Sequence, residues 1–122
     1  MFDRRDSHHR RAQRVALEVV SRAHAVTHDA VLTEVLAYFS EAGAASRQVA
    51  VEGVKQAVRA YEVLPADRAL FVAGLHRYAE RPDKEWSHVD CMSMVLMEQR
   101  GIRHVLTNDH HFAQAGFVVV NE

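Results

Sequence analysis

The residues best suited to chemistry in this sequence are three carboxylates that occupy comparable places in the chain. Asp90 falls in the first turn of a helix that opens at Ser87, and Asp109 lies two residues after the end of an apolar run at 104–107. Glu34 lies early in a helix that follows a weaker apolar run at 24–27. In a parallel sheet, strand ends and the helix starts that follow them share the edge where ligands bind. The spacing therefore predicts that the three carboxylates converge in one crevice.

Converging carboxylates repel one another and raise one another's pKa values unless a bound cation offsets the repulsion. Oxygen-rich sites of this kind suit Mg²⁺ or Mn²⁺, with water molecules completing the coordination. An ion held there could activate water and stabilise a phosphoryl transition state, as in metal-dependent nucleases. The carboxylates therefore favour metal-assisted phosphodiester chemistry.

Each carboxylate also has a simpler interpretation, and spacing alone leaves both open. Ser87-x-x-Asp90 fits a variant of the capping box, in which Asp90 satisfies backbone N–H groups. Asn108-Asp109 fits the N-cap of a short helix, and Glu34 fits a solvated helix surface. The nine histidines lack the spacing of a zinc site, although His110 and His111 fall near the expected crevice.

The elements that must position these residues alternate between helical periodicity and short β-branched runs. Only Asp90 and Ser93 are polar between 89 and 97, so the helix at 87–100 is expected to be buried. Asp29 or Thr27 is the expected cap of the helix at 29–42. The alternation, without a hairpin signal, predicts an α/β fold with a parallel sheet and helices on both faces. The expected strands are 24–27, 61–64, 104–107 and 117–120, and the other expected helices are 7–22, 46 to about 60, 65–81 (core side Leu70, Phe71, Leu75 and Tyr78) and 110–114.

Composition places the chain among ordinary globular proteins. Its 122 residues predict one domain over 1–122, with 48% hydrophobic and 25% charged residues. The net charge of −1 indicates no global field that would attract a nucleic acid or a membrane. The single cysteine, Cys91, suits a reducing compartment, and no apolar run approaches the length that spans a membrane. We therefore expect a cytoplasmic protein without a membrane partner.

A cluster of arginines near the start of the chain has two interpretations. It is typical of a solvated helix face, and it also suits a patch that contacts RNA phosphates, because the guanidinium fork matches phosphate oxygens. Its members are Arg4, Arg5, Arg10, Arg11 and Arg14.

Three segments together resemble the acidic motifs of PIN-domain proteins, a family that includes the VapC-type toxins of bacterial toxin–antitoxin pairs. The segment 27–36, with Glu34, resembles the second motif, and 87–91, with Asp90, resembles the third. The segment 105–112, with Asp109, resembles the fourth, and Gly116-Phe117 closes the pattern. The resemblance implies a three-layer α/β/α fold and an endoribonuclease that uses Mg²⁺ or Mn²⁺. It further implies that Glu34, Asp90 and Asp109 are the catalytic metal ligands, with Ser87 and Thr107 as supporting hydroxyls.

The sequence departs from the family pattern at the N-terminal side. Family members begin with an apolar strand that ends in a first acid and is followed by a short helix, whereas residues 1–9 here resemble the segment that follows that helix. Asp3 is no substitute, since only two residues precede it. Because the family's first strand lies in the middle of the sheet, its absence predicts that the two halves of the sheet pair directly or that a segment of a second copy or of an antitoxin fills the gap. A homo-oligomer (dimer) is favoured.

Two functions follow as alternatives from the resemblance. One is a metal-dependent ribonuclease with an RNA substrate and a cognate antitoxin as partner, weakened by the loss of the first acid. The other is a PIN-like binding or assembly module without turnover, which the absent acid favours for the chain as written.

Overall fold

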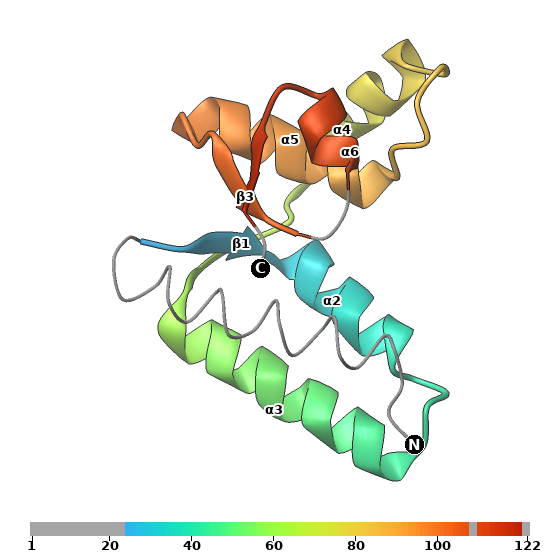
Figure 1. Ribbon diagram of the computed structural model, residues 1–122, viewed down its shortest axis with the longest axis vertical. Coiled ribbons are helices and arrows are strands. Elements are labelled where there is room, and N and C mark those ends of the chain that lie inside the picture. Colours follow the sequence, from blue (N-terminus) through green and yellow to red (C-terminus); the bar gives the residue numbers. More distant parts are fainter. Residues whose placement is uncertain (1–23, 108–109, 121–122) are drawn as a thin grey trace. The chain divides into compact units, whose positions relative to one another are not determined.

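The structure is a computed structural model that describes residues 24–107 and 110–120, with elements numbered as in Figure 1. The described residues form two compact units, one of 24–67 and one that begins at Arg68. The expected helix at 7–22 lies outside the described residues. In the described part, no helix is both long and apolar enough to cross a membrane.

The unit of 24–67 is a strand, two helices and a returning strand. Strand β1 (Val26–His28) leads into α2 (Asp29–Tyr38), α3 (Ala44–Ala60) follows, and β2 (Glu62–Leu64) returns (Figure 1). The two strands pair in parallel, with Val26 opposite Glu62 and His28 opposite Leu64. Helices α2 and α3 pack against each other, and the buried residues of this part are Ala50 and Ala57 of α3 and Phe39 at the end of α2.

The start of α2 differs from the expected one. Neither Asp29 nor Thr27 is the cap: His28 holds the N-cap position in an extended conformation and makes no capping hydrogen bond with its side chain. The reason is that β1 continues to His28, whose pairing with Leu64 keeps its backbone extended. Asp29 instead lies in the first turn of the helix, where a negative charge is favourable.

The second unit contains α4 (Arg68–Glu80), α5 (His88–Arg100), β3 (His104–Leu106), α6 (His111–Gln114) and β4 (Val118–Val120). Strands β3 and β4 also pair in parallel, with His104 opposite Val118. The described strands thus form two sheets of two strands each, and all four lie within two residues of their expected positions. The parallel α/β prediction is confirmed.

Helix α5 forms the centre of this unit, as its apolar sequence predicts. Cys91, Met92, Met94 and Met97 are all buried. The helix ends at Gly101, which adopts the left-handed conformation (φ 67°). Gly101 N–H donates to Glu98 O, and Ile102 N–H donates to Met97 O at 2.8 Å. This Schellman motif turns the chain from α5 into β3.

Helix α4 contacts α5 through a different face from the expected one. Leu70 and Gly74 are buried, whereas Phe71, Leu75 and Tyr78 are 42%, 46% and 53% exposed. A Cβ built on Gly74 would lie 2.5 Å from Met92 Cγ and 3.1 Å from Met92 N. The glycine therefore permits a close helix approach that a larger side chain would prevent, and the ion pair between Arg77 and Glu98 (2.6 Å) also joins the two helices.

The close approach at Gly74 predicts that Gly74→Ala destabilises the protein. Overpacking costs about 1–3 kcal/mol, which exceeds the gain in helix propensity of about 1 kcal/mol from glycine to alanine. We expect a net loss in the free energy of unfolding, measured in urea, and a larger loss for Gly74→Val. Removing the Met92 side chain beyond Cβ in Met92→Ala should reduce the cost of Gly74→Ala, and a stabilising Gly74→Ala would contradict the observed packing.

Burial of His28 predicts a dependence of stability on pH. Desolvation lowers the pKa of His28 below its ordinary value of 6.5, although the nearby Asp29 charge opposes the shift. As the pH falls below about 6.5, the unfolded chain gains a proton that the folded chain resists, so the stability contributed by neutral His28 is lost with acidification. We expect His28→Gln to reduce the loss of unfolding free energy between pH 7.5 and 5.5. His104→Gln, at an exposed histidine, is the matched control and should leave the pH dependence nearly unchanged.

Candidate functional site

Asp90 is held at the start of α5 by a capping box. The Ser87 hydroxyl accepts a hydrogen bond from Asp90 N–H at 3.0 Å, and Asp90 Oδ2 accepts one from Ser87 N–H at 3.1 Å. The reciprocal bonds satisfy two N–H groups that the first turn of a helix would otherwise leave unpaired. The structural interpretation of Ser87-x-x-Asp90 is therefore confirmed, with the Ser87 hydroxyl bonded to the Asp90 backbone N–H and the carboxylate bonded to the Ser87 backbone N–H.

The Asp90 carboxylate is also close to a histidine of α6. His111 Nδ1 lies 3.3 Å from Asp90 Oδ2, and the two side chains are only 17% and 16% exposed. The capping bond and the histidine contact both use the same oxygen, Oδ2. Asp90 is thus a largely buried carboxylate with one oxygen engaged by two donors.

The position of α6 depends on the core of its unit. Phe112 is buried with Trp86, Cys91, Met94 and Met97, and Trp86 Nε1–H donates to Gln114 Oε1 at 3.2 Å. Trp86 in turn stacks under the Arg81 guanidinium, 5.2 Å from the ring centre. Because Phe112 and Gln114 of this short helix are both held in this way, the first residue of the helix, His111, is placed beside Asp90.

The electrostatics near Asp90 follow from burial and from nearby charge. Burial raises the pKa of the Cys91 thiol, and the adjacent Asp90 charge adds to this effect, so Cys91 is a protonated core residue. In the preceding loop, the hydrogen bonds from Arg81 lower the pKa of Asp83 to about 2. The loop that leads to Ser87 therefore contains an ion pair in which both Asp83 oxygens accept from Arg81.

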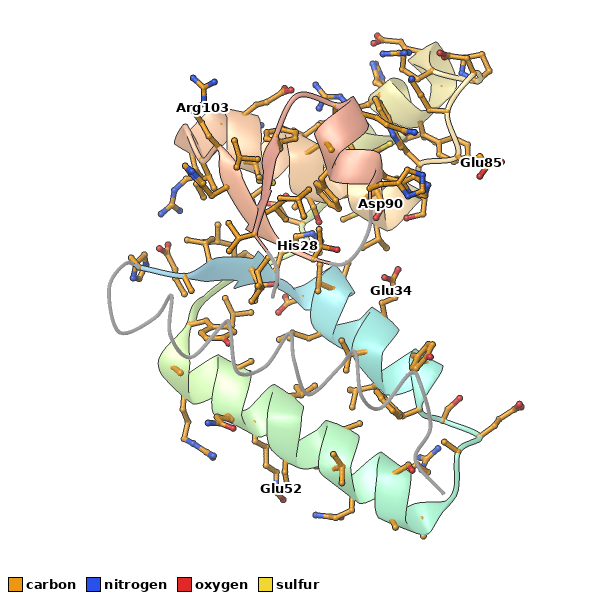
Figure 2. The ribbon with its side chains drawn as sticks, viewed as in Figure 1. His28, Glu34, Glu52, Glu85, Asp90 and Arg103 are labelled. Carbon is orange, nitrogen blue, oxygen red and sulfur yellow. The ribbon has the colours of Figure 1, made fainter. Side chains whose placement is uncertain are left out.

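The described residues do not place the other candidate ligands relative to Asp90. Glu34 is exposed on α2, in the unit of 24–67, while Asp90 lies at the start of α5 in the other unit (Figure 2). Asp109 lies outside the described residues, as do the five arginines near the start of the chain. Thr107 directly follows β3 and is half-buried. Convergence of the three carboxylates stays a prediction.

The donor chemistry of the described part suits a hard cation at Asp90. The Asp90 carboxylate supplies oxygen, the atom that Mg²⁺ and Mn²⁺ prefer. Within 24–107 and 110–120, no group of three His, Cys, Asp or Glu residues is placed to hold a metal ion. Asp90 could therefore contribute one carboxylate ligand to such a site.

The capping interpretation of Asn108-Asp109 falls outside the described residues. Within them, His110 precedes α6 in a helical conformation and makes no capping hydrogen bond with its side chain. Sequence reasoning placed His111 near the crevice but missed its contact with Asp90. The one signal for that contact is its position two residues after Asp109, in the last motif.

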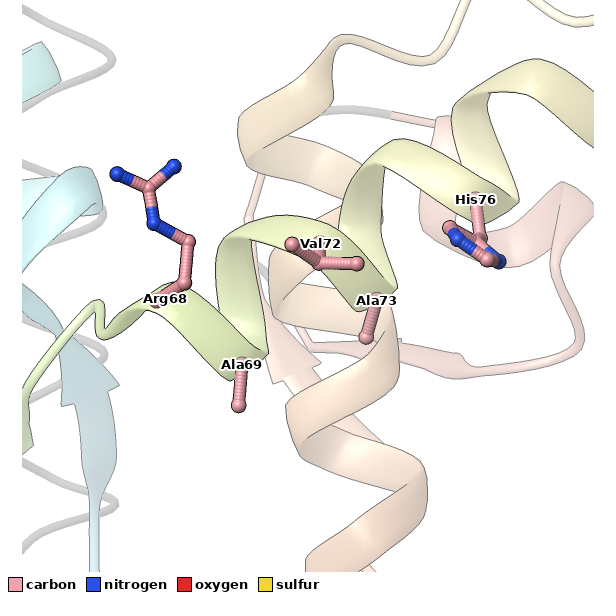
Figure 3. Close-up of a pocket in the computed structure, with 5 residues that line it drawn as sticks. All are labelled: Arg68, Ala69, Val72, Ala73 and His76. Carbon is pink, nitrogen blue, oxygen red and sulfur yellow. The ribbon is translucent and has the colours of Figure 1, made fainter.

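A separate hollow lies on α4 and is lined by Arg68, Ala69, Val72, Ala73 and His76 (Figure 3). Its described lining is mostly apolar and includes no carboxylate. This hollow is therefore not the acidic site, which begins at α5.

Comparison with known proteins identifies the family. The model of the PIN domain matches residues 1–118, so the chain belongs to the PIN domain family. Among solved structures, it is similar to VapC20 of Mycobacterium tuberculosis, a sarcin-ricin loop cleaving toxin. The TM-score is 0.77 and the identity 25%, over 98% of this chain and 88% of the other. No curated protein matches the sequence.

The capping box predicts that Ser87→Ala lowers the free energy of unfolding by about 1 kcal/mol, the usual cost of removing an N-cap hydroxyl. Ser87→Thr keeps the hydroxyl that accepts from Asp90 N–H and should cost much less. Urea unfolding of the three proteins measures the difference. Equal losses in the two variants would show that the cap contributes little.

Proposed function

We propose that this protein is a metal-dependent endoribonuclease of the PIN type and acts as the toxin of a toxin–antitoxin pair. The observation that carries the proposal is Asp90, a largely buried carboxylate held at the start of a buried helix in a chain of the PIN domain family. Buried charges are costly unless they are paired or bind a cation. Glu34, Asp90 and Asp109 are the proposed ligands of Mg²⁺ or Mn²⁺.

The roles of the residues follow from their chemistry. A bound ion would supply an activated water and offset the negative charge of a phosphodiester in the transition state. Asp90 would bind the ion, Ser87 would hold the Asp90 carboxylate through the capping box, and Thr107 would support Asp109 from the end of β3. The arginines at positions 4, 5, 10, 11 and 14 would contact RNA phosphates.

The proposed substrate is RNA, and the sarcin–ricin loop is the first RNA to test because VapC20 cleaves it. The proposed partner is a cognate antitoxin, and the proposed assembly is a dimer in the cytoplasm. The chain covers 88% of the VapC20 chain, which supports the transfer of the toxin class.

The experiment incubates the purified chain with a sarcin–ricin loop hairpin and with total RNA, with Mg²⁺ or with excess EDTA. We expect cleavage that needs Mg²⁺ and that Asp90→Asn lowers by about 100-fold or more, because a catalytic metal ion contributes several kcal/mol to the transition state. Glu34→Gln and Asp109→Asn should have effects in the same direction.

Glu52→Gln is the matched control for Glu34→Gln, since Glu52, like Glu34, is an exposed carboxylate on a helix, here α3 (Figure 2). It should cleave as the unaltered protein does. Cleavage that survives in Asp90→Asn, or that persists in EDTA, would contradict the proposal.

A second candidate function is RNA or protein binding without turnover. The observation that favours it is that the Asp90 carboxylate already has a structural role in the capping box and beside His111. Retention of the RNA by the chain without any Mg²⁺-dependent product would support this candidate instead.

A further inference from the structure

The His111 imidazole contacts the Asp90 carboxylate through its Nδ1 atom. A carboxylate can only accept hydrogen bonds, so the hydrogen in this contact is on His111 Nδ1. The Nδ1 to Oδ2 distance is 3.3 Å, and both side chains are more than four-fifths buried. A contact between such shielded groups is weakened less by solvent and salt than a surface ion pair is.

Both donors that approach the Asp90 carboxylate contact the same oxygen, Oδ2. Ser87 N–H and His111 Nδ1 both approach Oδ2, from the start of α5 and from α6 respectively. Two donors from different elements restrict the rotation of the carboxylate more than the capping box alone. Groups that hydrogen-bond to metal ligands in this way orient them and raise metal affinity.

The imidazole is itself fixed by its helix. Phe112, the next residue, is buried in the core, and Gln114 accepts a hydrogen bond from the Trp86 indole. The His111 ring also makes a tilted contact with the His110 ring, with 4.8 Å between the ring centres. His111 therefore has the rigidity that a positioning residue requires.

We propose that His111 is a positioning residue for the metal site: its Nδ1–H holds Asp90 Oδ2 and leaves the other carboxylate oxygen for a divalent ion. This inference rests on the proposed function, because it assumes that Asp90 binds the ion. It adds a residue outside the acidic set and assigns it a role in metal affinity rather than in the reaction.

The test measures the affinity of the full chain for Mn²⁺ by calorimetry, in the absence of RNA. His111→Leu removes the donor and should weaken Mn²⁺ binding by about 10-fold or more. His111→Asn places an amide nitrogen close to the position of Nδ1 and should restore affinity to within about three-fold of the original, a range set by the geometric match of the two donors. His111→Gln places its nitrogen nearer the position of Nε2 and should restore less.

Two controls separate positioning from folding. His104→Leu removes an exposed imidazole on β3 and should bind Mn²⁺ as the unaltered chain does. Urea unfolding of each metal-free variant shows whether a loss of affinity accompanies a loss of structure. A merely structural role for His111 would lower stability in His111→Leu and leave the affinity of the folded fraction unchanged, which would overturn the inference.

Asp90→Asn distinguishes a failure of this inference from a failure of the proposed function. If Asp90→Asn loses Mn²⁺ binding while His111→Leu keeps it, the metal site stands and His111 does not position it. If His111→Asn is as weak as His111→Leu, the Nδ1 donor is not the cause, and the inference is again overturned. If Asp90→Asn binds Mn²⁺ normally, or the unaltered chain binds none, the proposed metal site fails and this inference fails with it.

Discussion

The unit that begins at Arg68 depends on one constraint: a carboxylate stands at the start of a buried apolar helix. Removing the charge of Asp90 from water is unfavourable unless hydrogen bonds or an ion compensate for it. Ser87 supplies one donor locally, and His111 supplies another from α6. The placement of α6 on the core is therefore linked to the charge at the start of α5.

The same core holds α5 in place within this unit. Met94 and Cys91 are fully buried, and Gly74 allows α4 to approach Met92 closely. The Schellman motif at Gly101 satisfies the last carbonyls of α5 and brings Ile102 onto the core before β3 begins. The carboxylate at one end of α5 and the strand at its other end are thus positioned by a single rigid helix.

A capping role and a metal-binding role for Asp90 are compatible. The cap and His111 use Oδ2, so the structural contacts do not require both oxygens. The chain belongs to the PIN domain family, and its fold is similar to that of the toxin VapC20. A residue that stabilises the helix start in the metal-free protein can therefore also be a ligand, at the cost of making stability and metal binding interdependent.

The sequence by itself determined the parallel α/β class, the four strands and the buried character of α5, because each depends on local periodicity. The spacing of Ser87 and Asp90 offered the capping box as one of two interpretations. The sequence did not determine the cap of α2 or the buried face of α4. The pairing of His28 with Leu64 decided where α2 begins. The buried face of α4 was decided by the close approach of Met92 to Gly74, which only a small residue permits. The contact of His111 with Asp90 also depended on tertiary structure, since 21 residues separate them and only packing of Phe112 into the core brings them together.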